Sequence, residues 1–401
     1  MPIKSFKYRI YPTGKQRGAL QWTLDRCREL YNAALAERKE AYRMAGKSVG
    51  YYEQKRDLVE IKELRPEYKE IASHVLCDVI LRVEKAYKAF FRRVKNGEKP
   101  GFPRFQGYNR YDSFTYPDLQ GWKFVPGEKK HAKLILNKIY VVNVKMHRPI
   151  EGKIKTCTVK REGDHWYVIF ACEVKTEILP LSYEDVGIDL GITHFVACSD
   201  GSMIDNPRHY RRAEKRLKRL QQSLSRKKKG SHRRKKAAKA VTKAHRKIRN
   251  QRRDFHHKES RKLVNRYQVI VFEDLQTANL SKRPKPKQDE NGKYLPNGAA
   301  AKGGLNKSIN DAGWNSFTEM VKSKAENAGR IVLFVNPKYT SQICSGCGTI
   351  RKKDLSERWH SCECGCELDR DTNAAINILR LGHKELSARA VPTEQSVEAS
   401  A

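Results

Sequence analysis

Residues 186–201 read VGIDLGITHFVACSDG, in which an apolar run containing Asp189 is followed by a second apolar run that ends in a polar turn. Short runs of this kind predict the two strands of a hairpin. Residues 267–272 (YQVIVF) are almost continuously apolar, which is typical of a strand buried on both faces of a sheet, and Glu273 follows them directly. The two segments predict a sheet whose strands deliver two carboxylates.

A third acidic site lies near the C-terminus, where Asp369-Arg-Asp371-Thr-Asn373-Ala-Ala opens a helical stretch. Strand and helix ends can therefore bring three carboxylates to one place. Closely spaced carboxylates can hold two divalent cations about 4 Å apart around a scissile phosphate. The pattern predicts a nuclease that hydrolyses phosphodiesters with a pair of Mg²⁺ ions.

The composition indicates a polyanionic partner. The 401 residues include 82 Lys+Arg and 45 Asp+Glu, for a formal net charge of +37. A surplus this large points to nucleic acid. The hydrophobic content of 39% is enough for two or three cores, so we expect a multidomain globular protein rather than a disordered basic tail.

Residues 208–266 concentrate this charge, with 26 Lys/Arg and 3 acidic residues. Their apolar residues recur at heptad-like spacing, which predicts two antiparallel helices that turn at Gly230 and Ser231. So many like charges need phosphates to screen them, so we expect this pair to hold a nucleic-acid backbone without reading bases. The candidate contacts beyond the turn are Arg233, Arg234, Lys235 and Lys236.

Five of the ten cysteines lie between residues 344 and 366. The N-terminal residues lack a signal-peptide apolar region, and no apolar run approaches the ~18 residues of a membrane span, so we expect a cytoplasmic protein with no membrane partner. In a reducing compartment the cluster predicts a metal site rather than disulfides. The isolated cysteines, in apolar contexts, are expected to be core residues: Cys27, Cys77, Cys157, Cys172 and Cys198.

The cluster predicts one structural Zn²⁺. Cys344 and Cys347 have the standard two-residue spacer of a zinc knuckle, whereas Cys362 and Cys364 have only one residue between them. Cys366 or His360 therefore remains an alternative source of the fourth ligand.

The N-terminal half begins with period-two alternation over residues 4–11, which predicts a strand. A capping-box pattern at Thr13 opens a helix, and further helices are expected over about 50–64 and 68–96. Beyond residue 101 the short alternating runs predict a β-barrel that the first strand joins across the helical insert.

The C-terminal half continues with residues 281–307, which are rich in Pro, Gly and Lys and predict a mobile loop over the site. A helix over 315–328 and a strand over 330–335 follow. Hairpin, buried strand, helix, strand and terminal helix make an α/β arrangement that resembles the ribonuclease H fold.

Four motifs carry a more specific resemblance: Gly187-Ile-Asp189-Leu-Gly191, Phe272-Glu273-Asp274-Leu275, Tyr339-Thr-Ser-Gln-Ile-Cys-Ser-x-Cys347-Gly348 and Asp369-Arg-Asp371-x-Asn373-Ala-Ala. They occur in the order seen in the TnpB family of transposon-encoded, RNA-guided endonucleases with a RuvC-like domain. Smaller matches at residues 101–105, 254–258 and 307–317 extend the resemblance over about residues 1–383.

The resemblance implies that Asp189, Glu273 and Asp371 are the catalytic carboxylates that bind the Mg²⁺ pair. Anchoring on Asp-x-Asn-Ala-Ala selects Asp371, whereas Asp369 is expected to cap the helix. Alignment on Gly365 and Asp371 favours Cys362 and Cys364 as the second pair of zinc ligands. The implied partners are a guide RNA derived from the transposon end and target double-stranded DNA. The resemblance also implies a nucleoid-associated protein of a prokaryote.

The resemblance also implies the domain organisation, which combines an α/β part with β-barrel and α-helical parts. The expected ranges are a wedge-like β-barrel domain at 1–12 and 109–184, a helical recognition domain at 13–108, an RNase H-like (RuvC) nuclease domain at 185–340 and 368–383, a zinc ribbon at 341–367 and a disordered tail at 384–401.

Target choice in this family belongs mainly to guide pairing, while the protein reads a short duplex motif beside the target. We expect that reader in the helical insert, with Tyr52, Gln54, Lys55 and Ser73 as candidate contacts to bases or phosphates. Two other functions stay open: a cleavage-inactive, guide-dependent DNA-binding repressor, and a DNA transposase.

Overall fold

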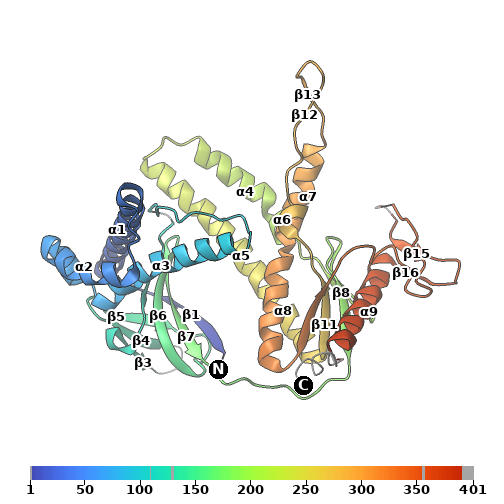
Figure 1. The fold of residues 1–401 in the computed structure, drawn as a ribbon, viewed down its shortest axis with the longest axis horizontal. Coiled ribbons are helices and arrows are strands. Elements are labelled where there is room, and N and C mark those ends of the chain that lie inside the picture. The colour runs from blue at the N-terminus through green and yellow to red at the C-terminus, as the bar shows by residue number, and fades with distance from the viewer. Residues whose placement is uncertain (1, 109, 128–130, 355–356, 391–401) are drawn as a thin grey trace, which may run out of the picture. The chain divides into compact units, whose positions relative to one another are not determined.

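The computed structural model describes residues 2–108, 110–127, 131–354 and 357–390 (Figure 1). The chain divides into two compact units, Met1–Lys175 and Thr176–Ala401. This boundary falls nine residues before the expected start of the nuclease domain at residue 185.

A seven-stranded sheet forms the centre of the first unit, in the order β2-β6-β7-β1-β5-β4-β3 with every neighbouring pair antiparallel. Its strands are β1 Ile3–Ile10, β2 Ser113–Tyr116, β3 Trp122–Pro126, β4 His131–Leu136, β5 Tyr140–Lys145, β6 Lys153–Glu162 and β7 His165–Glu173. The first strand thus joins the sheet across the helical insert, as the sequence predicts. The Tyr116 hydroxyl on edge strand β2 donates to the carbonyl of Asn137, in the β4–β5 turn, at 2.9 Å, so β2 lies close to a turn on the other side of the strand order.

The helical insert contains α1 Gly14–Ala45, α2 Tyr51–Leu64, a 3-10 turn Pro66–Glu70 and α3 Ser73–Lys95. The capping box at Thr13 is present, since the side chains and backbone amides of Thr13 and Gln16 hydrogen-bond reciprocally. The third helix starts at Ser73 rather than at residue 68, because the backbone at Ile71 is extended. The buried faces of α1 and α3 share one apolar core with the sheet.

A five-stranded sheet forms the centre of the second unit, in the order β10-β9-β8-β11-β14. Its strands are β8 Asp185–Asp189, β9 His194–Cys198, β10 Met203–Asp205, β11 Val269–Glu273 and β14 Ile331–Val335. Strands β8, β11 and edge strand β14 run parallel, whereas β9 pairs antiparallel with both β8 and β10. The parallel strands therefore present their carboxyl ends at one edge, where Asp189 and Glu273 lie.

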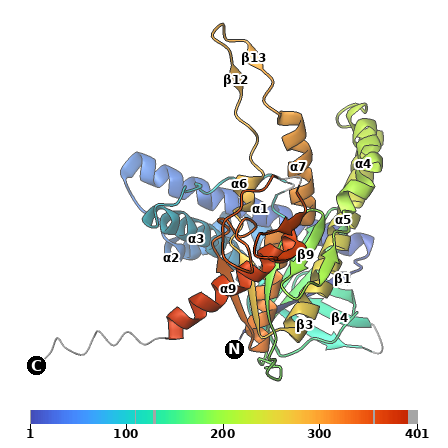
Figure 2. The same ribbon diagram turned by 90° about the vertical axis from the view of Figure 1, so that its right-hand side faces the viewer.

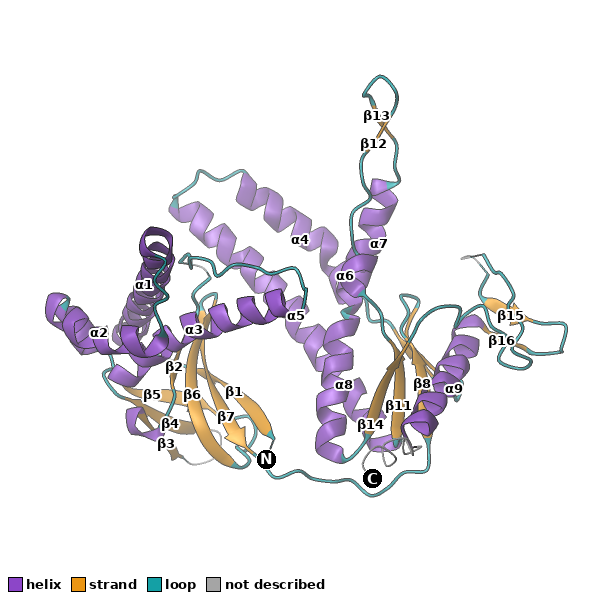
Figure 3. Cartoon of the chain, in the orientation of Figure 1, coloured by secondary structure: helices purple, strands orange, loops and turns teal. Residues whose placement is uncertain are grey.

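Helices cover both faces of this sheet (Figure 3). Ile270 and Phe272 pack in a core with α8 Trp314–Ala328, whereas Val269 and Val271 pack in a second core with α9 Arg370–Ala390. The alternation follows from the period of two along a strand. Figure 2 shows α9 in front of the strands.

Glycine permits the close approach of α9 to the sheet. A Cβ on Gly187 of β8 would lie 2.0 Å from the Ala375 carbonyl oxygen, and a Cβ on Gly382 of α9 would lie 2.4 Å from the Val271 side chain. At Gly187 the backbones of strand and helix touch, and at Gly382 the Val271 side chain packs against the helix backbone. This contact positions the first turn of α9, which carries Asp371.

The basic segment folds as predicted into two packed helices, α4 His209–Ser225 and α5 His232–Arg266, with Gly230 in the left-handed region at the turn. Gly230 has φ 85°, which suits glycine.

Residues 281–307 are not one mobile loop, and that prediction is wrong in part. They contain the short strands β12 Lys287–Gln288 and β13 Tyr294–Leu295 and the first turns of α7 Ala299–Ala312. Helix α7 forms despite Gly303 and Gly304 because tertiary contacts hold it: Arg211 donates to the Gly304 carbonyl at 2.7 Å. The hairpin projects from α7 (Figure 1).

The terminal helix is longer than expected, since α9 runs to Ala390 and includes residues that were assigned to a disordered tail. Residues 391–401 of that predicted tail lie outside the described residues. The isolated cysteines Cys27, Cys157, Cys172 and Cys198 are buried as predicted, and Cys77 is half-buried. Among the described residues, no helix combines the length and the apolar character needed to cross a bilayer.

Candidate functional site

Asp189 is the last residue of β8. Burial, together with the charges of Glu273 and Asp371, raises the pKa of its carboxyl to about 8. Because Asp189 interacts electrostatically with both Glu273 and Asp371, the three predicted carboxylates lie near one another. They come from β8, β11 and α9, respectively. A cluster in which two neighbouring carboxylates disfavour the ionisation of a third, Asp189, is a candidate cation site.

Asp371 enters the site from the first turn of α9. A Cβ on Gly191, in the turn after β8, would lie 3.9 Å from Asp371 Oδ2, so the turn and the carboxylate are in contact range. Burial, and next the charge of Asp369, raise the pKa of Asp371. Asp369 itself accepts hydrogen bonds from the amides of Asp371 at 2.8 Å and Thr372 at 3.3 Å. Asp369 is therefore the helix cap, as predicted.

Glu273 ends β11 and is 9% exposed. Burial raises the pKa of its carboxyl, while a hydrogen bond donated by the Thr340 hydroxyl to Oε1 lowers it. Thr340 is a functional candidate that the sequence analysis did not single out, although it belongs to the Tyr339-Thr-Ser-Gln motif.

Among the described residues, groups of three or more possible ligand atoms that all lie within 4.8 Å of one another contain Cys344, and none is formed by Asp189, Glu273 and Asp371.

A cavity of about 360 Å³ opens beside Glu273. Leu190, Trp314 and Phe334 supply its apolar wall, and Asn315, Thr318 and Lys322 supply polar groups. The Trp314 indole N–H donates to the Gly191 carbonyl at 3.3 Å, which fixes the wall against the turn after Asp189. Of the three carboxylates, Glu273 is the one that lines this cavity, and Asp274 and Glu319 add two further acidic groups.

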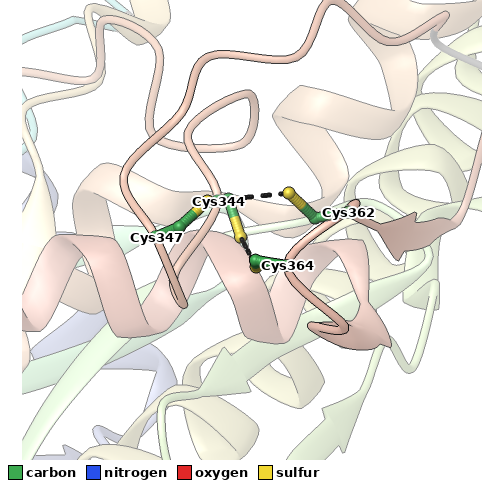
Figure 4. Close-up of side chains that lie close together, drawn as sticks. All are labelled: Cys344, Cys347, Cys362 and Cys364. Carbon is green, nitrogen blue, oxygen red and sulfur yellow. Dashed lines mark hydrogen bonds between the residues drawn. The ribbon is translucent and has the colours of Figure 1, made fainter.

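Four cysteine sulfurs from two loops gather into one cluster (Figure 4): Cys344, Cys347, Cys362 and Cys364. Cys344 Sγ lies 3.7 Å from Cys364 Sγ, and Cys347 Sγ lies 3.6 Å from Cys362 Sγ. Hydrogen bonds with Thr349 lower the pKa of Cys347 to about 6, which favours the thiolate that binds metal. The donor set fits a tetrahedral zinc site in spite of the one-residue spacer.

A second possible ligand group shares Cys344 and contains His360 and Cys366. Cys366 lies nearby, since its Sγ is 3.7 Å from the Ser345 hydroxyl. His360 is fully buried, and its Nε2 has no hydrogen-bond partner in the described part of the chain. His360 and Cys366, the two alternative sources of the fourth zinc ligand, therefore both lie beside the four-cysteine cluster.

Asp311 ties the basic helix pair to α7. Its buried carboxylate accepts hydrogen bonds from the amides of Tyr210 at 2.9 Å and Arg211 at 3.3 Å, and pairs with Arg252 at 3.0 Å. It thus caps α4, whose own N-cap, Arg208, makes no side-chain cap bond. Asp311 was not singled out from the sequence, because only the tertiary fold brings it to α4.

The predicted nucleic-acid contacts fall into two groups. Tyr52, Lys55 and Ser73 are exposed in unit 1, and Ser73 Oγ accepts a hydrogen bond from Lys62 at 2.8 Å. Gln54 is 2% exposed, and its amide bonds to Arg38, Glu37 and the Ala34 carbonyl. The prediction that Gln54 contacts nucleic acid is therefore wrong: its side chain holds α2 against α1.

The four predicted nucleic-acid contacts after the α4–α5 turn differ in their exposure to solvent. Arg233, Lys235 and Lys236 are exposed. Arg234 is half-buried and donates to the carbonyls of Leu224 at 2.9 Å and Lys227 at 3.0 Å. Its guanidinium caps the end of α4, so Arg234 has a structural role at the turn.

Family models match three parts of the chain. They are described as "Probable transposase" over residues 170–283, "Cas12f1-like, TNB domain" over residues 314–378 and "Helix-turn-helix domain" over residues 1–47. The second of these covers the cysteine cluster and the start of α9.

Two full-length relatives are similar. The "Putative RNA-guided DNA endonuclease InsQ" of Escherichia coli K12 is 32% identical over 391 residues, which are 96% of this chain and 94% of that protein. A "Putative RNA-guided DNA endonuclease" of Streptomyces pristinaespiralis is 33% identical over 386 residues, with 94% and 89% covered. Shorter matches include TnpB-like proteins of Acanthamoeba polyphaga mimivirus, at 29% identity over 140 residues.

Two solved structures share the fold. The protein of a Cas12f1-sgRNA-target DNA complex superposes with a TM-score of 0.59 at 12% identity, covering 94% of this chain and 98% of that one. The mini-RNA-guided endonuclease CRISPR-Cas_phi3 superposes with a TM-score of 0.53 at 11% identity, with 95% and 92% covered. The RNase H-like (RuvC) architecture inferred from the sequence agrees with these folds.

Proposed function

Because the chain belongs to the TnpB family, we propose that it is an RNA-guided DNA endonuclease that cleaves target DNA beside a short flanking motif. The observation that carries the proposal is the meeting of Asp189, Glu273 and Asp371 at the carboxyl edge of the β8-β11-β14 strands. The names of the two full-length relatives support the same activity.

The three carboxylates would hold a pair of Mg²⁺ ions. The chemistry that such a pair supplies is activation of a water and stabilisation of the leaving oxygen. The residues of this chain fix the distance and direction of the ligands: Asp189 and Glu273 through the parallel register of β8 and β11, and Asp371 through the capped first turn of α9. The cavity beside Glu273 would receive the strand to be cut.

The remaining parts take the roles expected from the family. Residues 1–12 with 109–184 would act as the wedge domain, residues 13–108 as the recognition domain, and residues 341–367 as a zinc ribbon held by the four clustered cysteines. Exposed Tyr52, Lys55 and Ser73 are the candidate contacts to the flanking duplex. The α4–α5 pair would hold guide RNA, derived from the transposon end, or its heteroduplex with the target.

The test starts with sequencing of the RNA that copurifies with the protein. The loaded protein is then incubated, with Mg²⁺, with a plasmid library that carries the guide-matched target beside randomised flanks. Cleavage of a flank-selected subset supports the proposal. Flank-selected binding without cleavage would instead identify a repressor, and joined DNA ends would identify a transposase, the activity named by the model that matches residues 170–283.

A further inference from the structure

The segment that connects β14 to the first cysteine contacts the carboxylate site directly. Thr340 is 4% exposed and donates its hydroxyl to Glu273 Oε1. Tyr339, just before it, has φ 68°, a left-handed conformation that costs free energy for a tyrosine. Surrounding contacts must therefore hold this turn in place.

Asn377, on α9, supplies part of that restraint. Its side-chain amide is 5% exposed and donates to the carbonyl of Thr340 at 2.9 Å and to that of Ile343 at 2.7 Å. The backbone of Thr340 is thus bonded to the helix that carries Asp371, while its hydroxyl is bonded to Glu273.

Asn373 extends the same network to the cysteines. It is fully buried, donates to the Ile343 carbonyl at 2.8 Å, and accepts from the amide of Ser345, the neighbour of Cys344, at 2.9 Å. Asn373 lies two residues after Asp371. A continuous chain of hydrogen bonds therefore joins the cysteine cluster, the first turns of α9 and Glu273.

We propose that Thr340 is a positioning residue for Glu273, and that the metal-bound cysteine loop holds Thr340 in place and so sets the cation affinity of the carboxylate site. The inference rests on the proposed nuclease function. The hydroxyl holds one carboxylate oxygen of Glu273, Oε1, and so restricts the rotation of the carboxylate. Outer contacts of this type orient ligands, and their loss commonly lowers metal affinity 10- to 100-fold.

The test compares Thr340→Val, which is nearly isosteric and lacks the hydroxyl, with Thr340→Ser, which keeps it. Mn²⁺ binding to the RNA-loaded protein is measured by electron paramagnetic resonance. An Asp189→Ala complex with the same RNA is subtracted, so that ions bound by RNA cancel. We expect the valine variant to raise the dissociation constant about tenfold. The serine variant should stay within about twofold of wild type, and the Mg²⁺ concentration for half-maximal cleavage should shift in parallel.

The coupling to the cysteine loop is tested with Cys347→Ser, alone and combined with Thr340→Val. If the loop acts through Thr340, each single change weakens Mn²⁺ binding and the double variant is no weaker than the stronger single effect. Additive losses, or an unchanged affinity in Cys347→Ser protein with reduced zinc, would overturn the coupling. Wild-type affinity in the valine variant would overturn the role of Thr340.

A different result would count against the proposed function itself. If wild-type protein bound no more Mn²⁺ than the Asp189→Ala complex, the carboxylate site would fail and this inference with it. If excess Mn²⁺ bound to wild type but Thr340→Val had no effect, only the inference would fail.

Discussion

Asp189, Glu273 and Asp371 reach one site from three elements that are far apart in sequence, and the charges of the other two add to burial in raising the pKa of Asp189. We predict that Asp189→Ala reduces cleavage to below about 1% of wild type while guide and target binding persist, because the change removes a metal ligand and no phosphate contact. Glu273→Ala and Asp371→Ala should behave alike. Plasmid cleavage and gel-shift assays on the same preparations measure both properties.

The matched control for these variants is Asp369→Asn. Asparagine caps a helix about as well as aspartate, so cleavage should remain close to wild type. Loss of cleavage in this variant, or its retention in any of the three alanine variants, would contradict the assignment of that residue.

His256 offers a separate prediction at the scale of one side chain. It is buried against Phe195 and Phe317, its Nε2–H donates to the Ala312 carbonyl at 2.9 Å, and burial lowers its pKa to about 4. The unfolded chain, with an ordinary histidine pKa near 6.5, binds the proton more readily. The stability that neutral His256 contributes is therefore present above about pH 6.5 and is lost as pH falls toward 4.

The measurement is denaturant unfolding of wild type and His256→Gln at pH 7.5 and pH 5. The amide of glutamine can still donate to Ala312 but does not titrate. Wild type should lose roughly 2 kcal/mol more than the variant over this interval. Equal losses would mean that His256 is accessible to protons in the folded state.

Among the elements, α9 depends on a backbone contact with the sheet. We predict that Gly187→Ala destabilises the second unit by roughly 1 to 3 kcal/mol, because the new Cβ would overlap the Ala375 carbonyl and displace the helix. Cleavage should fall as well, since Asp371 moves with α9. Gly303→Ala, where an added Cβ meets nothing within 4 Å, is the control and should be neutral or slightly stabilising. Calorimetric unfolding of both variants tests the prediction.

The cysteine loops form the second element with a direct test. Cys344→Ser should lower zinc content and destabilise the C-terminal region, because Cys344 belongs to both possible ligand groups. Cys366→Ser should leave zinc stoichiometry unchanged if the four-cysteine group binds the ion. Elemental analysis decides the point: loss of zinc from the Cys366 variant would move the fourth ligand to that residue.

At the scale of the whole molecule, the net charge of +37 favours association with a polyanion. We predict that Arg233→Gln, Lys235→Gln and Lys236→Gln combined weaken RNA binding equally for unrelated guides. The log–log salt slope should fall by roughly 0.7 to 0.9 for each phosphate that the variant no longer binds. Affinity measured against salt for two guides tests this. An unchanged slope, or a weakening confined to one guide, would contradict backbone binding.

Arg234 is kept in that variant because it caps α4. Arg234→Ala alone should lower the unfolding temperature and leave the salt slope of RNA binding nearly unchanged. This difference separates damage to the α4–α5 turn from removal of a phosphate-binding charge.

Local patterns were sufficient to predict much of the framework. Burial of one or both faces of a single element leaves a periodic pattern of apolar residues in the sequence. Examples are the alternation of Phe6 and Tyr8, the apolar run before Glu273 and the helical spacing along α8. The capping box at Thr13 and the cap at Asp369 are equally local, since each involves residues within one helical turn. The order of motifs also selected three carboxylates whose charges interact in the structure, where Glu273 and Asp371 raise the pKa of Asp189.

Tertiary structure decided what depends on long-range partners. The sequence around Gln54 does not show that its side-chain amide is hydrogen-bonded to Arg38 and Glu37. The sequence around Thr340 does not show that its hydroxyl donates to Glu273, 67 residues away. The helical start of α7, within a stretch rich in glycine and proline, likewise depends on Arg211 from another helix. Most strands and helices, and the candidate ligand side chains, could be read from the sequence alone, because burial period, capping and ligand chemistry are local. Which polar groups are committed to internal hydrogen bonds was decided by the fold, because only folding brings distant donors and acceptors within bonding distance.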